Sequence, residues 1–128
     1  IIAETNLKEE VIFTGRLSNE ELNLVLGSAL ALTFVPYYEG FGIPLVEAMH
    51  SQVPIISSNV TSMPEIVGNA ALLVNPMEVT QIKNAMIELF NNKNLREDLI
   101  TKGGVQKQKF SWEKSGDLLW ESILKATN

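Results

Sequence analysis

Short apolar runs alternate along the chain with longer segments in which apolar residues recur at helical spacing. Four of the short runs are rich in β-branched residues and end near glycine or proline, as is typical of strands. The predicted strands are residues 11–14, 31–35, 54–57 and 71–74. Because they are apolar on both faces, we expect them to form a parallel sheet that is buried on both sides.

The segments between the predicted strands have helix signals. Ser18 precedes Glu20 and Glu21, which predicts an N-cap followed by acidic residues in the first turn. A proline just inside a helix start, Pro64, marks another helix near residues 61–65. The remaining predicted helices span residues 44–50, 79–90, 95–110 and 111–125.

This alternation predicts an α/β fold with a Rossmann-like, doubly wound parallel sheet and flanking helices. Folds of this class bind ligands at the carboxyl ends of their strands, but the class does not identify the ligand.

Composition and charge exclude several classes of function. The net charge of −5 and a pI near 4.8 argue against a surface that binds nucleic acid. There are no cysteines, which excludes disulfides and thiolate metal sites. The longest apolar stretch, residues 24–36, is interrupted and falls short of the ~20 residues of a membrane span, and residues 1–6 lack a signal-peptide pattern. We therefore expect a cytoplasmic protein.

The most informative segment lies between the second predicted strand and the following helix. Gly40 and Gly42 remove side chains where the chain turns, and a helix begins near Ile43. Its free N–H groups and dipole favour phosphate. Glu39 lies at the mouth of this predicted site and Glu47 about one turn inside the helix, where carboxylates suit the hydroxyls of a sugar or a ribose.

The spacing of the two acids is weak evidence by itself, because Glu113 and Glu121 repeat it on a helix face that we interpret as solvated. The specificity comes from the residues between them. The run Glu-Gly-Phe-Gly-Ile-Pro-Leu-Val-Glu-Ala-Met, residues 39–49, resembles the E-x7-E motif of retaining glycosyltransferases with the GT-B fold, family 4-like (group 1). The resemblance extends to residues 11–22, 53–59, 63–68, 70–76 and 110–113.

The resemblance implies a donor site for a nucleoside-diphosphate sugar, without a bound metal or other cofactor. Glu39 would contact hydroxyls of the transferred sugar as the catalytic residue, and Glu47 would bind the ribose. Arg16 and Leu17 would lie near the nucleobase. The backbone amides that would lie against the sugar and diphosphate are those of Gly40, Phe41, Gly42 and Ile43.

The resemblance also implies that residues 1–128 form part of a C-terminal nucleotide-sugar-binding domain, truncated on its N-terminal side and inactive alone. The acceptor, a glycan or a lipid-linked sugar, would bind an N-terminal domain, and the function would belong to cell-surface polysaccharide biosynthesis. The full-length protein could then lie at the inner face of the membrane. The family's Arg and Lys beside the diphosphate, five positions apart, have no counterpart here.

Two positions depart from the family pattern. Tyr37 stands where serine is frequent, and Gln52 stands after a helix end, where glycine would adopt a left-handed conformation. Tyr37 and Tyr38 have two open interpretations, namely lining the sugar pocket or covering the strand end. Trp112 and Trp120 are predicted to lie in the core or at a domain contact.

Other functions remain open from the residues alone. His50 is predicted to be a helix C-terminal residue and Glu65 to act within its turn. The chief alternative is a non-catalytic nucleotide-, phosphate- or sugar-binding α/β module; a hydrolase with paired carboxylates is less favoured.

A last hypothesis concerns the sheet edge. If two central strands are missing, residues 11–14 either pair directly with residues 31–35 in a four-stranded sheet or leave an edge open. We favour the open edge, with self-association of the isolated chain.

Overall fold

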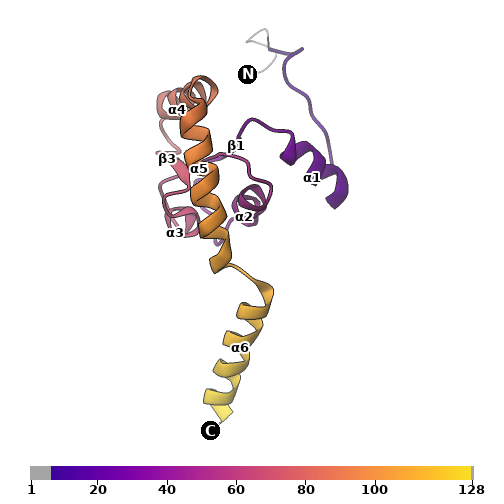
Figure 1. The fold of residues 1–128 in the computed structure, drawn as a ribbon, viewed down its shortest axis with the longest axis vertical. Coiled ribbons are helices and arrows are strands. Elements are labelled where there is room, and N and C mark those ends of the chain that lie inside the picture. Colours follow the sequence, from indigo (N-terminus) through magenta and orange to yellow (C-terminus); the bar gives the residue numbers. More distant parts are fainter. Residues whose placement is uncertain (1–6, 128) are drawn as a thin grey trace.

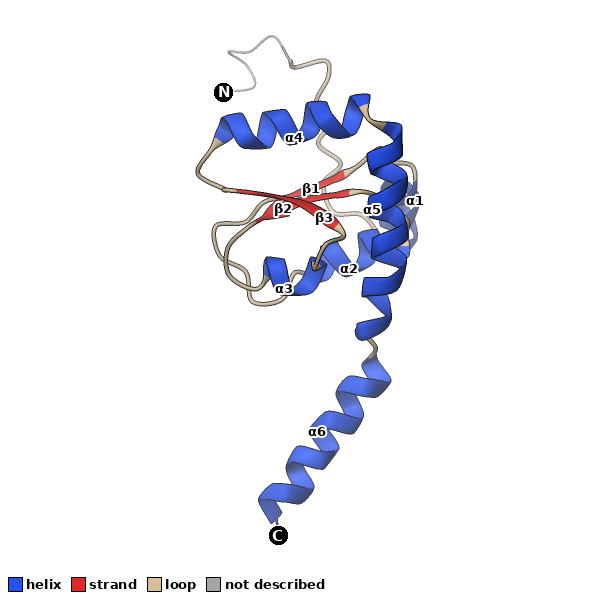
Figure 2. Cartoon of the chain, turned by 60° about the vertical axis from the view of Figure 1, so that its left-hand side comes forward, coloured by secondary structure: helices blue, strands red, loops and turns tan. Residues whose placement is uncertain are grey.

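The computed structural model describes residues 7–127, which form a parallel sheet with helices on both of its faces (Figures 1 and 2). The sheet has three strands in the order β1-β2-β3. They span Leu32–Phe34, Ile55–Ser58 and Ala71–Val74. Both pairs are parallel, with Thr33 beside Ile56 and Ile56 beside Leu72. The predicted α/β class with a parallel sheet is confirmed.

Helix α4 covers one face of the sheet, and α2 and α3 cover the other (Figure 2). Helix α5 packs against all three of these helices. The helices are α1 (Asn19–Gly27), α2 (Ile43–His50), α3 (Met63–Val67), α4 (Val79–Asn91), α5 (Lys93–Gln106), the short 3-10 helix η2 (Lys107–Lys109) and α6 (Trp112–Thr127). The predicted helices are therefore all present, with ends shifted by a few residues.

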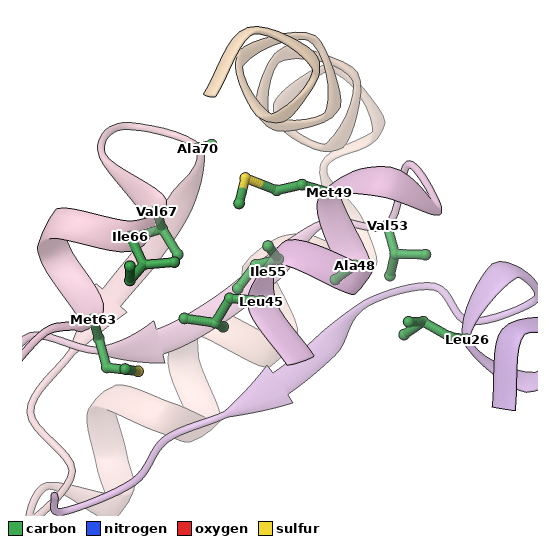
Figure 3. Packing of buried hydrophobic residues seen from close by; sticks show 10 residues of the cluster. All are labelled: Leu26, Leu45, Ala48, Met49, Val53, Ile55, Met63, Ile66, Val67 and Ala70. Atoms are coloured by element: carbon green, nitrogen blue, oxygen red, sulfur yellow. The ribbon is translucent and has the colours of Figure 1, made fainter. Parts of the chain in front are cut away.

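Each face of the sheet has its own hydrophobic cluster, because successive residues of a strand point to opposite sides. Ile55 packs with Leu45 of α2 and with Met63 and Val67 of α3, as Figure 3 shows. Ile56 packs on the other side with residues of α4 and α5. The continuous apolar pattern of the strand thus has the expected consequence of burial on both faces.

Two local features fix the helices that surround the site. Ser18 caps α1, as predicted, and it also forms a capping box with Glu21. The hydrogen bond from the Ser18 backbone N–H lowers the pKa of the Glu21 carboxyl. At α5, the buried Gln106 donates Nε2 hydrogen bonds to the carbonyls of Ile66 (2.9 Å) and Glu65 (3.2 Å). These carbonyls belong to the last turn of α3, so Gln106 satisfies acceptors that the helix itself leaves open.

The prediction of a strand at residues 11–14 is wrong. This segment is irregular, and Ile12 and Phe13 are 84% and 81% exposed. A strand needs a neighbour for its backbone hydrogen bonds, and residues 11–14 pair with none of the described strands. Direct closure onto β1 is therefore wrong too, and β1 stays at the edge of the described sheet.

Trp112 and Trp120 do not lie in the core, so of their two predicted places only the domain contact stays a prediction. Helix α6 extends away from the sheet (Figure 1). None of its residues is buried. Trp112 is 88% exposed, although the helical spacing of apolar residues is real. The pattern indicated an amphipathic helix correctly, but it could not show which body covers its apolar side. No helix among residues 7–127 is long and apolar enough to cross a membrane.

Candidate functional site

The loop of residues 35–42 joins the carboxyl end of β1 to the first turn of α2, the edge at which α/β sheets bind ligands. Gly42, the N-cap of α2, has φ 87° and ψ 57°, a left-handed conformation that favours glycine. A Cβ at this position would lie 2.9 Å from Met63 Cε and 3.1 Å from Leu45 Cδ1. Backbone conformation and close packing therefore both require glycine here, which brings the main chain close to the core.

The N-terminus of α2 has unused hydrogen-bond donors. No side chain caps the helix, and Pro44 in its first turn has no N–H to satisfy. No hydrogen bond between described residues uses the N–H of Gly42 or of Ile43. Free donors at the positive end of a helix dipole are suited to a phosphate group.

Glu39 stabilises this loop from within. Its Oε1 accepts a hydrogen bond from the N–H of Gly40 (2.9 Å) and a longer one from that of Phe41 (3.4 Å). Its carbonyl accepts a hydrogen bond from Ser62 Oγ (2.8 Å), which ties the loop to the start of α3. Glu39 is half-buried. The amides of Gly40 and Phe41, expected to face a ligand, therefore bond to the Glu39 carboxylate in this structure.

Glu47 lies about one turn after the start of α2 and lines a cleft of about 890 Å³. Phe41 and Ile43 line the same cleft, and Phe110 meets Phe41 edge to face at a centroid distance of 5.7 Å. The opposite wall comes from the first turns of α6 and includes Trp112. The half-buried Glu47 carboxylate thus lies beside aromatic side chains, an environment that suits a ribose with its base.

The structure does not gather all of the predicted site residues. Glu39 does not line the cleft of Glu47, and neither do Arg16 and Leu17. Arg16 is exposed and Leu17 is half-buried in the turn before α1. Their predicted place near the nucleobase depended on a strand at residues 11–14, which the described structure lacks.

Some residues of the cleft had no predicted role. Asn23 of α1 and the side chains of Lys109 and Lys114 reach its walls. The helical spacing of residues 43, 46, 47 and 50, which share one face of α2, was the one available sequence signal. It could not show that the turn between η2 and α6 would lie opposite this face. His50 also lines the cleft, in the last turn of α2 where it was predicted.

Two further predictions concern residues around the loop. Tyr37 and Tyr38 are exposed, so the interpretation that they cover the strand end is not supported by their environment. Glu65 is an exposed residue in the first turn of α3. Among the described residues no group of three or more His, Cys, Asp or Glu side chains could hold a metal ion.

Comparison with known proteins gives consistent similarities. The family described as "Glycosyl transferases group 1" matches residues 1–105. O-antigen chain mannosyltransferase B of Escherichia coli is 37% identical over 101 residues, which are 79% of this chain and 26% of that protein. Serotype-specific mannosyltransferase WbdA of Escherichia coli is 30% identical over 116 residues, covering 91% of this chain and 14% of that protein.

A solved structure shows the same fold. Sucrose-phosphate synthase from Thermosynechococcus elongatus superposes with a TM-score of 0.84 at 28% identity, over 98% of this chain and 33% of that one. The chain therefore spans a third or less of each of these proteins.

Proposed function

The chain belongs to the glycosyl transferases group 1 family, and from this we propose that it is the donor-binding part of a retaining glycosyltransferase. The reaction would transfer a sugar from a nucleoside-diphosphate sugar to a glycan or a lipid-linked acceptor. Both curated relatives described above are named mannosyltransferases, so we propose mannose as the sugar and polysaccharide biosynthesis as the setting. The proposed location is the cytoplasm or the inner face of the membrane.

One observation carries this proposal, namely the two half-buried glutamates that flank an uncapped helix N-terminus. Glu47 shares its cleft with aromatic and apolar side chains, as a nucleoside requires. The free N–H groups of Gly42 and Ile43 supply the donors that a diphosphate requires. Glu39 then has the position to bind hydroxyls of the sugar attached to that diphosphate.

The proposed chemistry follows from where charge develops. When the bond between the anomeric carbon and the diphosphate breaks, negative charge grows on the leaving oxygen. The N–H groups and dipole of α2 would stabilise this charge more strongly in the transition state than in the bound donor. Glu39 would hold the sugar while its carboxylate exchanges the Gly40 amide for a sugar hydroxyl. Binding energy from the nucleoside at Glu47 would keep the anomeric carbon in place.

We also propose that the transfer needs no bound metal and that residues 1–128 alone do not catalyse it. Chelation with EDTA would leave the activity of the full-length protein unchanged. The acceptor would be bound largely by protein outside this chain, since the aligned residues make up only 26% and 14% of the two relatives described above.

Titration of the full-length protein with a panel of nucleoside diphosphates tests the donor site directly. We expect one diphosphate to bind more tightly than its monophosphate, and its mannose derivative to support transfer. Tight binding without transfer to any mannan acceptor would favour the alternative of a non-catalytic nucleotide-binding module. Absence of binding by every nucleotide would reject the donor site.

A further inference from the structure

Two adjacent tyrosines follow β1 with little contact to the rest of the chain. Tyr37 is 69% exposed and Tyr38 is 84% exposed, and neither belongs to a hydrophobic cluster of the described residues. Burial of aromatic rings is a major source of folding free energy, and these two rings contribute little to it. Their role in stability is therefore small, and a role in binding accounts better for two rings at this position.

The backbone that carries the tyrosines is fixed on both sides. Before them the chain leaves the sheet through the half-buried Pro36, whose ring restricts φ. After them the carbonyl of Glu39 accepts the hydrogen bond from Ser62 Oγ at 2.8 Å, and Gly42 is buried against Met63. The two rings thus extend into solvent from an anchored loop, which lowers the entropy that a ligand would have to overcome.

The tyrosines lie next to the proposed sugar site but outside the proposed nucleotide cleft. Glu39 directly follows Tyr38, whereas the cleft is lined by residues that come after Glu39, among them Phe41, Ile43 and Glu47. Neither tyrosine lines that cleft. A group bound by these rings would lie beside Glu39 and outside the cleft proposed for the nucleotide, which is the place that an acceptor of the transferred sugar requires.

We propose that Tyr37 and Tyr38 bind a neutral pyranose ring of the acceptor glycan, an inference that rests on the function proposed above. The apolar face of a phenol ring can pack against the C–H groups of a pyranose, and its hydroxyl can donate and accept hydrogen bonds with sugar hydroxyls. Such a contact needs no charge on the ligand. The tyrosines are specificity-determining residues in this proposal and take no part in bond breaking.

The test compares alanine and phenylalanine variants of the full-length enzyme, with nucleoside-diphosphate mannose as donor and mannotriose as acceptor. Tyr37→Ala and Tyr38→Ala are expected to raise the KM for mannotriose roughly five- to tenfold each. The KM for the donor is expected to stay unchanged. Tyr37→Phe and Tyr38→Phe keep the ring and should retain most of the wild-type acceptor KM.

The matched control is Met77→Ala. Met77 is a similarly exposed apolar side chain, 71%, that lines neither hollow of the described residues, and its replacement should leave both KM values unchanged. An unchanged acceptor KM in both alanine variants would overturn the proposal. A raised donor KM would also overturn it, because the rings would then hold the donor sugar.

Direct binding separates this proposal from the proposed function. Saturation-transfer NMR with mannotriose needs no catalysis. We expect a saturation-transfer signal with the wild-type protein and its loss in the variant that carries both Tyr37→Ala and Tyr38→Ala. If the wild type transfers no sugar but shows this difference, the proposed function fails and the carbohydrate site stands. If the signal is equal in wild type and variant, or absent from both, the tyrosine site is rejected.

Discussion

The Glu39 carboxylate has two potential sets of partners, the amides of its own loop and the hydroxyls of a sugar. In the structure it bonds to the N–H groups of Gly40 and Phe41. A bound sugar would draw it away from them, and the released amides would then be free for the diphosphate. This exchange would couple donor binding to the arrangement of the loop.

Glu39→Gln tests the role of the charge. The glutamine oxygen can still accept the Gly40 N–H, so the loop is expected to remain folded. We expect turnover of the full-length enzyme to fall by the equivalent of about 1.5–3 kcal/mol, the range for a hydrogen bond to a charged group. Affinity for the bare nucleoside diphosphate, which lacks sugar hydroxyls, should change little. Equal losses of turnover and of nucleotide affinity would contradict the assignment.

Glu47→Ala tests the ribose contact. It is expected to weaken nucleoside-diphosphate binding by about 1.5–3 kcal/mol in isothermal titration, because a half-buried charged acceptor is lost. Discrimination between ribo- and 2′-deoxyribonucleotides should be lost with it. Glu65→Ala removes an exposed acid from the first turn of α3 and serves as the control. A Glu47→Ala variant that still discriminates fully would refute the ribose role.

Gln52 shows a departure from the glycine expected at its position. Its φ of 58° lies in the left-handed region, as the prediction for a helix end required, and the side chain makes this conformation costly. We expect Gln52→Gly to stabilise the protein by up to about 1 kcal/mol, measured by thermal melting. The neighbouring Ser51 has φ −79°, so Ser51→Gly relieves no strain and should be neutral or destabilising. Equal effects at the two positions would show that Gln52 is not strained.

At the scale of elements, the sequence predicts best what depends on nearby residues. β3 was predicted at its observed bounds and α4 to within a residue, because two-sided apolar runs and helical periodicity are local signals. The loop and helix start around Gly42 were predictable for the same reason. The segment 11–14 has as strong a strand pattern, yet it stays irregular, because a strand also needs a ladder partner and this segment pairs with none of the described strands.

In the candidate site, too, the residues close together in the sequence were predictable and those distant in the sequence were not. Glu39, Glu47 and the uncapped start of α2 lie within one short stretch, so their arrangement follows from the turn and the helix. The opposite wall of the cleft, with Phe110 and Trp112, comes from a part of the chain distant in sequence. No periodicity predicts that contact, since it depends on the direction in which the chain leaves α5.

Gln106 links α5, to which it belongs, with the last turn of α3, so its loss should weaken the packing of these two helices. Gln106→Leu removes the donor for the carbonyls of Ile66 and Glu65 while keeping most of the side-chain volume. Because buried acceptors are left unsatisfied, we expect destabilisation of about 1–3 kcal/mol in chemical denaturation. Gln108→Leu, at an exposed site in η2, is the control and should have little effect. A neutral Gln106→Leu would show that these carbonyls find another partner.

At the scale of the whole molecule, the described chain leaves two apolar surfaces without a cover. One is the edge of β1 with the adjoining hollow of about 530 Å³, lined by Leu30, Met86 and Phe90 among others. The other is the apolar side of α6, with Trp120 and Ile123 exposed. Most of the stability of such a helix comes from packing its amphipathic face against another body. Both surfaces therefore favour association of the chain with a further body.

We predict that the isolated chain of residues 1–128 self-associates through these surfaces. Direct closure of residues 11–14 onto β1 would have hidden one edge, and the structure does not show it. Sedimentation velocity over a concentration series is expected to show a rising mean sedimentation coefficient. Trp120→Glu places a charge on the apolar side of α6 and should weaken the association, whereas Glu121→Gln on its polar side should not. A single monomeric species at high concentration, with a cooperative melt, would refute self-association. Both apolar surfaces would then be tolerated in water, because the acidic net charge of −5 keeps the copies apart.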